Sequence, residues 1–364
     1  MTDSDERSRR KTPWWRRRRT LLGALGVILL GVFVYQLAPQ LAGLSATLRR
    51  LRNGDPWWLA AGLVLEALSL GGYVMLFRAV LSCHNVHIGW RASYEITLAG
   101  TVATKLLAAG GAGGLALTAW ALRASGLSAR QVARRLVAFD VLLYAVYMGA
   151  LIVLGLGLRT GLFAGGGSWA LTVLPAVFAT AVIALVLSAL LVPDDVERRL
   201  KRLARGRRHA RRALAALAQV PHTLHTGTEV ALELVRERPL TLVGAFAYWG
   251  FDVAVLWVGF RAYGGAPPLA IVVMAYFVGT LANLLPLPGG VGGVEGGMIG
   301  TLLAFGSSGS AAVLAVLTYR AISFWLPLLP GGVAYWQLRQ RVAEWRERFE
   351  ERPARKVPVP AGGD

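Results

Sequence analysis

Long blocks of apolar residues most constrain what this 364-residue chain can fold into. Each block runs for roughly 18 to 25 residues, the length that an α-helix needs to cross about 30 Å of hydrocarbon. Hydrophobic residues make up 55% of the chain and charged residues only 16%. Because a water-soluble fold could not bury so much apolar surface, the sequence predicts an all-α polytopic integral membrane protein.

The uninterrupted blocks predict about six full membrane spans. They lie at about 21–39, 57–81, 136–158, 169–192, 240–261 and 311–337. We expect one transmembrane domain over residues 21–338, preceded by a basic N-terminus at 1–20 and followed by a basic tail at 339–364.

Two further apolar segments are interrupted. The first runs from Tyr94 to Leu122 and contains Gly110-Gly-Ala-Gly-Gly114. The second runs from Leu269 to Phe305 and contains Pro286-Leu-Pro-Gly-Gly-Val-Gly-Gly293. Clustered glycines favour non-helical backbone, and proline removes a hydrogen-bond donor. Each segment therefore predicts a broken-helix hairpin, either re-entrant or fully spanning.

Positive charge is concentrated outside the apolar blocks. The chain has a formal charge of +19, with basic clusters within residues 7–19, 198–238 and 339–356. This placement follows the positive-inside rule, so we expect attraction to anionic lipid and no nucleic-acid partner. A hairpin adds an even number of crossings, which puts all three clusters on one side. Both termini and a basic loop at 193–239 are thus predicted to be cytoplasmic, in a cytoplasmic membrane.

An internal repeat relates the two interrupted segments. Residues 100–114 align without gaps to residues 279–293, and eight of the fifteen positions are identical. Upstream, Phe77-Arg-Ala79 corresponds to Phe260-Arg-Ala262. The match indicates two related units, repeat one at about 57–158 and repeat two at about 240–337.

The order of the spans predicts that the two repeats are inverted. Three full spans and one hairpin separate the starts of the units, which is an odd number of crossings. Inverted repeats with broken helices at matching positions are typical of secondary transporters, whose substrate site lies near the midplane where the breaks meet.

Residues at the two breaks are candidates for lipid-headgroup binding. Each glycine cluster precedes a new helix, so unpaired backbone amides and a positive helix end face whatever occupies the break. This suits an anion such as a phospholipid phosphate; close helix packing through glycine is the alternative. The candidates are Lys105, Gly110, Gly111, Gly113, Gly114, Pro286, Pro288, Gly289, Gly290, Gly292, Gly293 and Glu295.

Ionisable residues inside apolar blocks are costly and point to function. They are Glu66, Lys105, Asp140, Asp252, Glu295 and Arg320. Asp140 and Arg320 occupy matching positions of opposite charge in the repeats, so we predict an intramembrane salt bridge that either holds the two halves together or has a gating or substrate role. Glu295 either caps its own helix or contacts substrate, and Lys105 either snorkels or receives a phosphate.

Sequence signatures of catalysis are absent. The chain contains no nucleophile with a partner base, no phosphate-binding loop and no nucleotide fingerprint, so we expect neither an enzyme nor a cofactor. His84 and His87 lack a further ligand cluster, and Cys83 is the only cysteine, so no metal site is expected.

One stretch of the second break carries a family resemblance: Asn283-Leu-Leu-Pro-Leu-Pro-Gly-Gly-Val-Gly-Gly-Val-Glu-Gly-Gly297. Through it, the chain resembles the lysylphosphatidylglycerol synthetase transmembrane family, a flippase-like membrane region. The resemblance covers roughly Arg16 to Arg339. It adds Asn283 to the candidate headgroup-binding residues and places Glu295 and Arg320 on family positions. It implies movement of an aminoacylated or otherwise modified lipid between leaflets. Bifunctional members add a soluble aminoacyl-transferring domain, which we do not expect here.

The expected function is therefore translocation of a phospholipid or polyprenyl-phosphate-linked lipid, with anionic or aminoacylated membrane lipids as partners. The alternative is a non-transporting membrane scaffold for a lipid synthase or glycosyltransferase. Transport predicts a cavity at the breaks that reaches polar residues at mid-depth. Scaffolding predicts packed breaks and an exposed interaction face.

Overall fold

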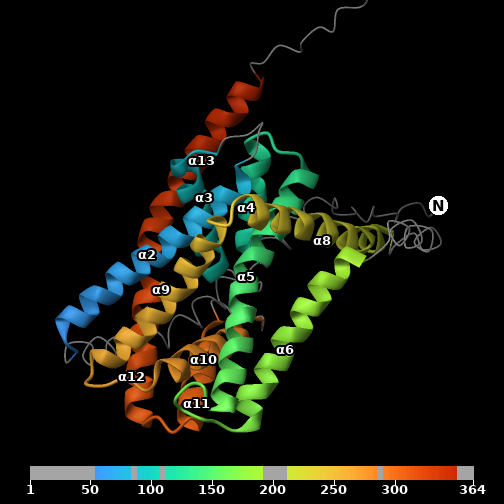
Figure 1. Ribbon diagram of the computed structural model, residues 1–364. Helices are drawn as coiled ribbons and strands as arrows, with labels where there is room; N and C mark the ends of the chain where they lie inside the picture. The colour runs from blue at the N-terminus through green and yellow to red at the C-terminus, as the bar shows by residue number, and fades with distance from the viewer. Residues whose placement is uncertain (1–53, 83–87, 107–111, 192–210, 285–289, 351–364) are drawn as a thin grey trace, which may run out of the picture. The chain divides into compact units, whose positions relative to one another are not determined.

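The computed structural model describes residues 54–82, 88–106, 112–191, 211–284 and 290–350. All regular elements within these ranges are helices, as predicted (Figure 1). In chain order they are α2 (Pro56–Leu81), α3 (Trp90–Leu106), α4 (Ala112–Ala124), α5 (Ala129–Thr160), α6 (Trp169–Ser188), η1 (Ala189–Leu191), α8 (Arg211–Glu237), α9 (Thr241–Arg261), α10 (Leu269–Thr280), η3 (Leu281–Leu284), α11 (Gly293–Ala304), α12 (Gly309–Arg320), the π-helix η5 (Ala321–Trp325) and α13 (Leu328–Glu350).

Five of the described helices are long and apolar enough to cross a membrane. They are α2, α5, α6, α9 and a continuous stretch, Gly309–Trp345, that joins α12, η5 and α13. These five helices match five of the six predicted spans. The remaining predicted span, 21–39, lies outside the described residues. The last helix is longer than the predicted 311–337, because α13 continues to Glu350.

Local sequence signals explain where the long helices begin and end. Asp55 accepts a hydrogen bond from the Trp57 amide at 2.9 Å, and Pro56 occupies the first turn of α2. Ser128 and Gln131 form a reciprocal capping box at the start of α5. At the other end of α5, Gly161 takes a φ of 77°, a left-handed conformation that glycine adopts without strain.

The first helices of the two predicted repeats, α2 and α9, pack against each other in antiparallel directions. The Ser69 hydroxyl donates to the Tyr248 carbonyl at 2.9 Å. At the crossing, a Cβ added to Gly72 would lie 2.8 Å from the Gly244 carbonyl oxygen. Only glycine allows two backbones to approach this closely. An antiparallel pair of equivalent helices supports the inverted relation of the repeats.

Each interrupted segment forms a helical hairpin around a glycine contact. In the hairpin α3–α4, a Cβ on Gly114 would lie 2.6 Å from the Gly100 carbonyl oxygen. In the hairpin α10–α11, a Cβ on Gly297 would lie 2.9 Å from the Gly279 Cα. Gly100 and Gly279 are the matching first residues of the repeat alignment. Glycine packing is thus one role of these motifs.

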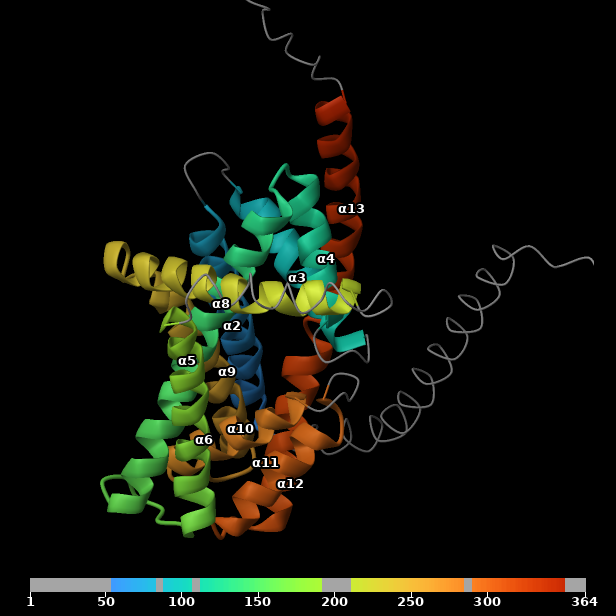
Figure 2. The same ribbon diagram turned by 90° about the vertical axis from the view of Figure 1, so that its right-hand side faces the viewer.

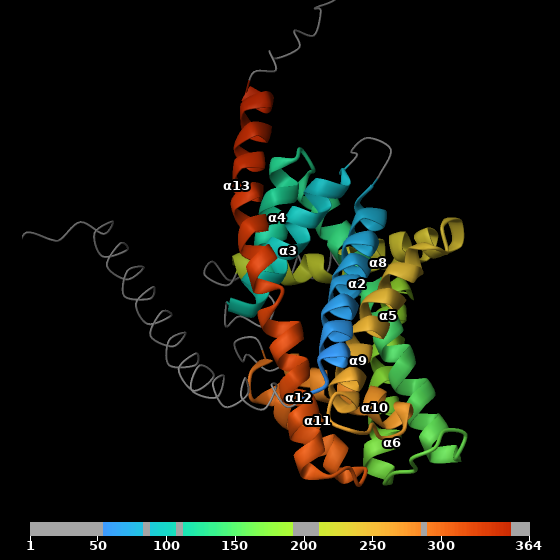
Figure 3. The same ribbon diagram turned by 90° about the vertical axis from the view of Figure 1, so that its left-hand side faces the viewer.

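The two hairpins lie toward opposite ends of the long helix formed by α12, η5 and α13 (Figures 2 and 3). Helix α3 runs antiparallel to α13, since Glu95 pairs with Arg341 near the C-terminal end of α13. Further along α3, Lys105 reaches the Ser323 carbonyl in η5. The other hairpin packs through α11 against α12. This is the arrangement that inverted broken hairpins predict.

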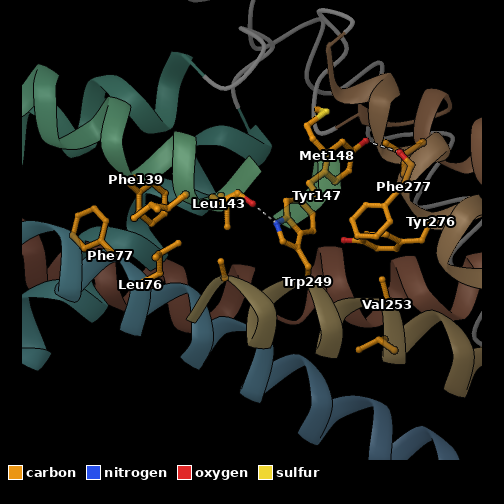
Figure 4. Close-up of a cluster of buried hydrophobic side chains, with 14 of the residues drawn as sticks. Leu76, Phe77, Phe139, Leu143, Tyr147, Met148, Trp249, Val253, Tyr276 and Phe277 are labelled. Carbon is orange, nitrogen blue, oxygen red and sulfur yellow. Dashed lines mark hydrogen bonds between the residues drawn. The ribbon is translucent and has the colours of Figure 1, made fainter. Parts of the chain in front are cut away.

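An aromatic cluster joins α5, α9 and α10 (Figure 4). Trp249 packs against both Tyr147 and Phe277, with ring centroids 5.2 and 5.8 Å away. Its indole N–H donates to the Leu143 carbonyl at 2.8 Å, and the Tyr147 hydroxyl donates to the Phe277 carbonyl at 2.5 Å. Both polar atoms are therefore satisfied inside an apolar core.

Helix α8 lies within the predicted basic loop at 193–239 and crosses α5 (Figures 1 and 2). A Cβ on Gly227 would overlap the Val137 side chain, so α8 rests directly on α5. Residues 192–210 of this loop lie outside the described ranges.

Candidate functional site

The second break is held together by side chains that reach back to its backbone. Gly290 has a φ of 67°, and a Cβ there would overlap Asn283 Oδ1, so these two candidates face each other across the break. Gly292, with a φ of 79°, donates its amide to Glu295 Oε2 at 2.8 Å. Glu295 thus caps α11, as one of its two predicted roles requires. Pro286, Pro288 and Gly289 lie outside the described residues.

The other oxygen of Glu295 binds Arg320. Arg320 Nε donates to Glu295 Oε1 at 2.7 Å, and both side chains are largely buried. The repeat alignment predicts an ion pair between Arg320 and Asp140. Among the described residues, Arg320 instead pairs with Glu295, and no ion pair joins it to Asp140. Asp140 instead lies near the phenols of Tyr73 and Tyr144. Arg320 therefore ties the second break to α12.

The first break contributes Lys105 to the same region. Lys105 Nζ donates to the Ser323 carbonyl at 2.5 Å and lies 5.6 Å from the centre of the Phe324 ring. The Arg320 guanidinium lies 4.8 Å from the same ring. A π-turn departs from regular helical hydrogen bonding, and such turns are frequent at functional sites. In the first glycine cluster, Gly114 is buried in the hairpin and Gly113 is half-buried; Gly110 and Gly111 lie outside the described residues.

Behind Lys105 lies a buried network built around Asp252. Asp252 Oδ2 accepts hydrogen bonds from the Tyr276 hydroxyl and, at 3.2 Å, from the Tyr319 hydroxyl. The carboxyl group of Glu66 is close enough to hydrogen-bond with that of Asp252, and Lys105 interacts electrostatically with both. Glu66, Lys105, Asp252, Tyr276 and Tyr319 form what we call the polar network. It joins α2, α3, α9, α10 and α12.

An apolar groove of about 920 Å³ lies between α5, α9 and α10. Its lining includes Gly149, Gly250, Val273 and the exposed side chain of Phe246. The transport hypothesis places a cavity at the glycine clusters. The groove instead lies beside α10, the first arm of the second hairpin, and none of the described glycines of the two clusters lines it.

The groove and the polar network occupy neighbouring faces of the same two helices. On α9, Trp249 and Val253 line the groove while Asp252 belongs to the network. On α10, Phe277 lines the groove while the adjacent Tyr276 donates to Asp252. Figure 4 shows Trp249, Val253, Tyr276 and Phe277 in one cluster. A single layer of side chains thus separates the groove from buried charge.

The sequence identifies the charged members of the site but not the polar groups around them. Tyr276 and Tyr319 lie in apolar runs, where a tyrosine is equally typical of a core or a membrane interface. Ser323 enters through its backbone carbonyl, which no side-chain pattern reveals. The bidentate pair of Glu95 with Arg341, at 2.5 and 2.8 Å, was also not predicted. The signal that could have revealed this pair is Glu95 itself, because an ionisable residue in an apolar segment calls for a partner.

Within the described ranges, no group of three or more histidine, cysteine, aspartate or glutamate side chains is arranged to hold a metal ion. His84 and His87 lie outside those ranges. Among the described residues near the breaks, Lys105 and Arg320 are cations that lie by the Phe324 ring.

The chain is similar to membrane proteins of archaea. A UPF0104 membrane protein of Methanothermobacter thermautotrophicus is 24% identical over 322 residues, which cover 85% of this chain and 93% of that protein. The UPF0104 membrane protein PH1989 of Pyrococcus horikoshii is 31% identical over 94 residues, which cover 26% of this chain and 28% of that protein.

A family match spans most of the polar and hairpin architecture described above. Residues 21–331 match the family described as Lysylphosphatidylglycerol synthase TM region. The match includes both hairpins, the polar network and the helices that line the groove. This chain therefore belongs to the lysylphosphatidylglycerol synthase transmembrane region family.

Proposed function

We propose that this membrane protein moves a phospholipid or a polyprenyl-phosphate-linked lipid between the leaflets of a cytoplasmic membrane. One observation carries the proposal: an apolar groove in membrane-spanning helices lies one side-chain layer from a buried charged network. A lipid is the membrane component that combines a long apolar chain with a charged headgroup. The family to which the chain belongs fits a lipid-related role.

The groove supports the binding of the apolar part of such a lipid. Its volume, about 920 Å³, falls within the range of about 300 to 1,000 Å³ that ligand sites occupy. Its walls belong to α5, α9 and α10, and because α5 and α9 are candidate spans we expect the groove to face the bilayer rather than water. Phe246 lines the groove and is exposed, so we expect an acyl or prenyl chain to enter beside it.

Charged groups near the breaks support the passage of a headgroup. Lys105 and Arg320 come from the ends of α3 and α12, which belong to different repeats. Both cations contact the Phe324 ring, so they lie in one region inside the protein. In transporters with inverted repeats, broken helices present such groups near the bilayer midplane. We infer that these two cations meet a lipid phosphate there.

The remaining assignments belong to the same proposal. The chain would act without catalysis and without a cofactor, on anionic or aminoacylated lipids, and without a nucleic-acid partner. Both termini and the basic loop would face the cytoplasm, which the basic residues beside the spans favour.

Reconstitution would test the activity. The purified chain is placed in liposomes that contain a trace of fluorescent phosphatidylglycerol, lysyl-phosphatidylglycerol or polyprenyl phosphate. A membrane-impermeant reductant then bleaches the label in the outer leaflet. Vesicles with the protein should lose more than half of the signal for at least one lipid, because labelled lipid from the inner leaflet becomes accessible. Empty vesicles should lose about half, since a small vesicle has two leaflets.

Filling the groove gives the sharper test. Gly250 lines the groove, and an added Cβ there meets no atom within 4 Å. Gly250→Leu should therefore fold and should slow lipid transfer at least several-fold. Gly71→Leu is the matched control, because Gly71 on α2 is equally open but lies away from the groove. Equal transfer by both variants would remove the groove from the pathway. No transfer of any lipid by the unmodified chain would favour the scaffold alternative.

A further inference from the structure

Two buried carboxyl groups face each other between α2 and α9. Glu66 exposes 3% of its surface and Asp252 exposes 7%. The two groups lie within hydrogen-bonding reach of each other. Each residue lies near the middle of a helix that is long enough to span the membrane. An uncompensated charge is most costly at this depth.

One oxygen of each carboxyl group is fully buried and accepts no hydrogen bond. These atoms are Glu66 Oε2 and Asp252 Oδ1. The phenols of Tyr276 and Tyr319 both donate to the other oxygen of Asp252. Lys105 Nζ donates to a backbone carbonyl. Ionised carboxylates only accept hydrogen bonds, so two facing carboxylates cannot satisfy each other. A proton on one of them supplies the missing donor.

The surrounding charges lead to the same conclusion. Ionised Glu66 and Asp252 carry two negative charges, and Lys105 supplies one positive charge toward them. Glu295 and Arg320 form an ion pair that is neutral in itself. Among the described residues, the other titratable groups that face the carboxyl pair are phenols, which are uncharged: Tyr248 of α9, Tyr276 of α10 and Tyr319 of α12. One excess negative charge is therefore left in a low-dielectric region, and one proton cancels it.

We propose that Glu66 and Asp252 together bind one exchangeable proton inside the membrane. The proton comes from a hydronium ion, which leaves as water, and it is held between Glu66 Oε2 and Asp252 Oδ1, so one O–H bond breaks and one forms. With the proton bound, Glu66, Asp252 and Lys105 sum to zero charge. Without it, they present a net negative charge that repels a phosphate and attracts an amine. Proton binding itself does not depend on lipid movement. Only its coupling to headgroup passage rests on the proposed function.

Infrared spectroscopy of the full chain tests the site directly. The protein is reconstituted in liposomes of phosphatidylethanolamine and phosphatidylglycerol, and spectra are compared in H₂O and D₂O. A protonated carboxyl group gives a C=O stretching band, distinct from that of a carboxylate, which shifts on deuteration. The wild-type chain should show such a band at neutral pH. Glu66→Gln and Asp252→Asn should each abolish it, because the remaining carboxylate then balances Lys105 and accepts from the new amide.

Control variants keep the test independent of folding defects. Glu229→Gln, which changes a carboxylate that is 57% exposed on α8, should retain the band. Lys105→Met should raise its intensity about twofold, since both carboxyl groups must then be protonated to stay neutral in the membrane. A wild-type spectrum without the band, or a band retained in both pair variants, would overturn the proposal.

Two further experiments complete the test. The first distinguishes a bound proton from a bound metal cation, and the second separates proton binding from lipid transfer. Replacing choline chloride by sodium chloride at fixed pH should leave the band unchanged. Loss of the band on sodium addition would assign the site to a metal cation instead. Lipid transfer is measured on the same vesicles. A chain that keeps the band but moves no lipid would refute the proposed function and leave the proton site standing.

Discussion

Glu295 joins two parts of the molecule through its two carboxylate oxygens. One oxygen caps the first turn of α11 through Gly292, and the other pairs with Arg320 of α12. A carboxylate at a helix N-terminus also complements the helix dipole. The cap and the ion pair are therefore parts of one arrangement, in which a side chain from the second break fixes the neighbouring helix.

At the residue scale, removing Arg320 should destabilise the protein. Arg320→Met leaves Glu295 partly buried without its cation, which costs on the order of 3 kcal/mol. The double variant Arg320→Met with Glu295→Gln should lose less stability than the sum of the two single changes. Thermal unfolding of purified protein in detergent measures all four chains. Strict additivity would show that the two side chains do not interact.

At the element scale, the contact of α2 with α9 depends on glycine. A Cβ on Gly244 would lie 2.7 Å from the Leu76 amide nitrogen and 2.8 Å from the Gly72 carbonyl oxygen. Because backbone atoms cannot move aside as a flexible side chain can, the helices would have to separate. The antiparallel packing of the two repeats then loosens along its whole length.

Gly244→Ala should therefore lower stability by about 1–3 kcal/mol through overpacking. Gly250→Ala is the matched control on the same helix, because an added Cβ there meets no atom within 4 Å. Its melting temperature should equal or slightly exceed that of the wild-type chain, since alanine favours the helix. Similar melting temperatures for the two variants would contradict the close contact.

The sequence predicts elements better than it predicts partners. Apolar blocks such as 169–192 reveal their helices because crossing a bilayer requires a fixed length of apolar chain. Repeat alignment places Asp140 and Arg320 at equivalent positions, but it does not determine where their side chains point. The left-handed backbone at Gly292 brings Glu295 into range of Arg320, and that local geometry has no signature in the alignment. The polar network is not predicted for a similar reason. Tyr276 and Tyr319 stand out from other tyrosines only because they donate to Asp252, and the sequence does not show those contacts.

At the scale of the whole molecule, the direction of each span follows from the order of helices and charges. Helix α5 ends at Thr160, a short turn follows, and α6 returns toward α8. With the N-terminus in the cytoplasm, that turn is expected outside. Helix α8 and the end of α13 are then expected inside, beside the basic clusters.

Single-cysteine labelling tests this topology. In a Cys83→Ser background no native cysteine remains, since the chain has only one. We expect Leu162→Cys to react with a membrane-impermeant maleimide in intact cells, because Leu162 is 76% exposed in the α5–α6 turn. Glu233→Cys and Glu347→Cys should react only after the membrane is permeabilised. Labelling of Leu162→Cys and Glu233→Cys from the same side would contradict the parity of the spans.

The π-helix between α12 and α13 determines the rotation of one half of this long helix relative to the other. Each residue of an α-helix advances by about 100°, so one extra residue in a turn rotates everything after it by that angle. Before the π-helix, Tyr319 and Arg320 point toward the polar network and the second break. After it, Gly331 and Arg341 point toward α3. Deleting one residue from 321–325 would keep the length of the span nearly intact, yet it would turn one of these two faces away from its partner.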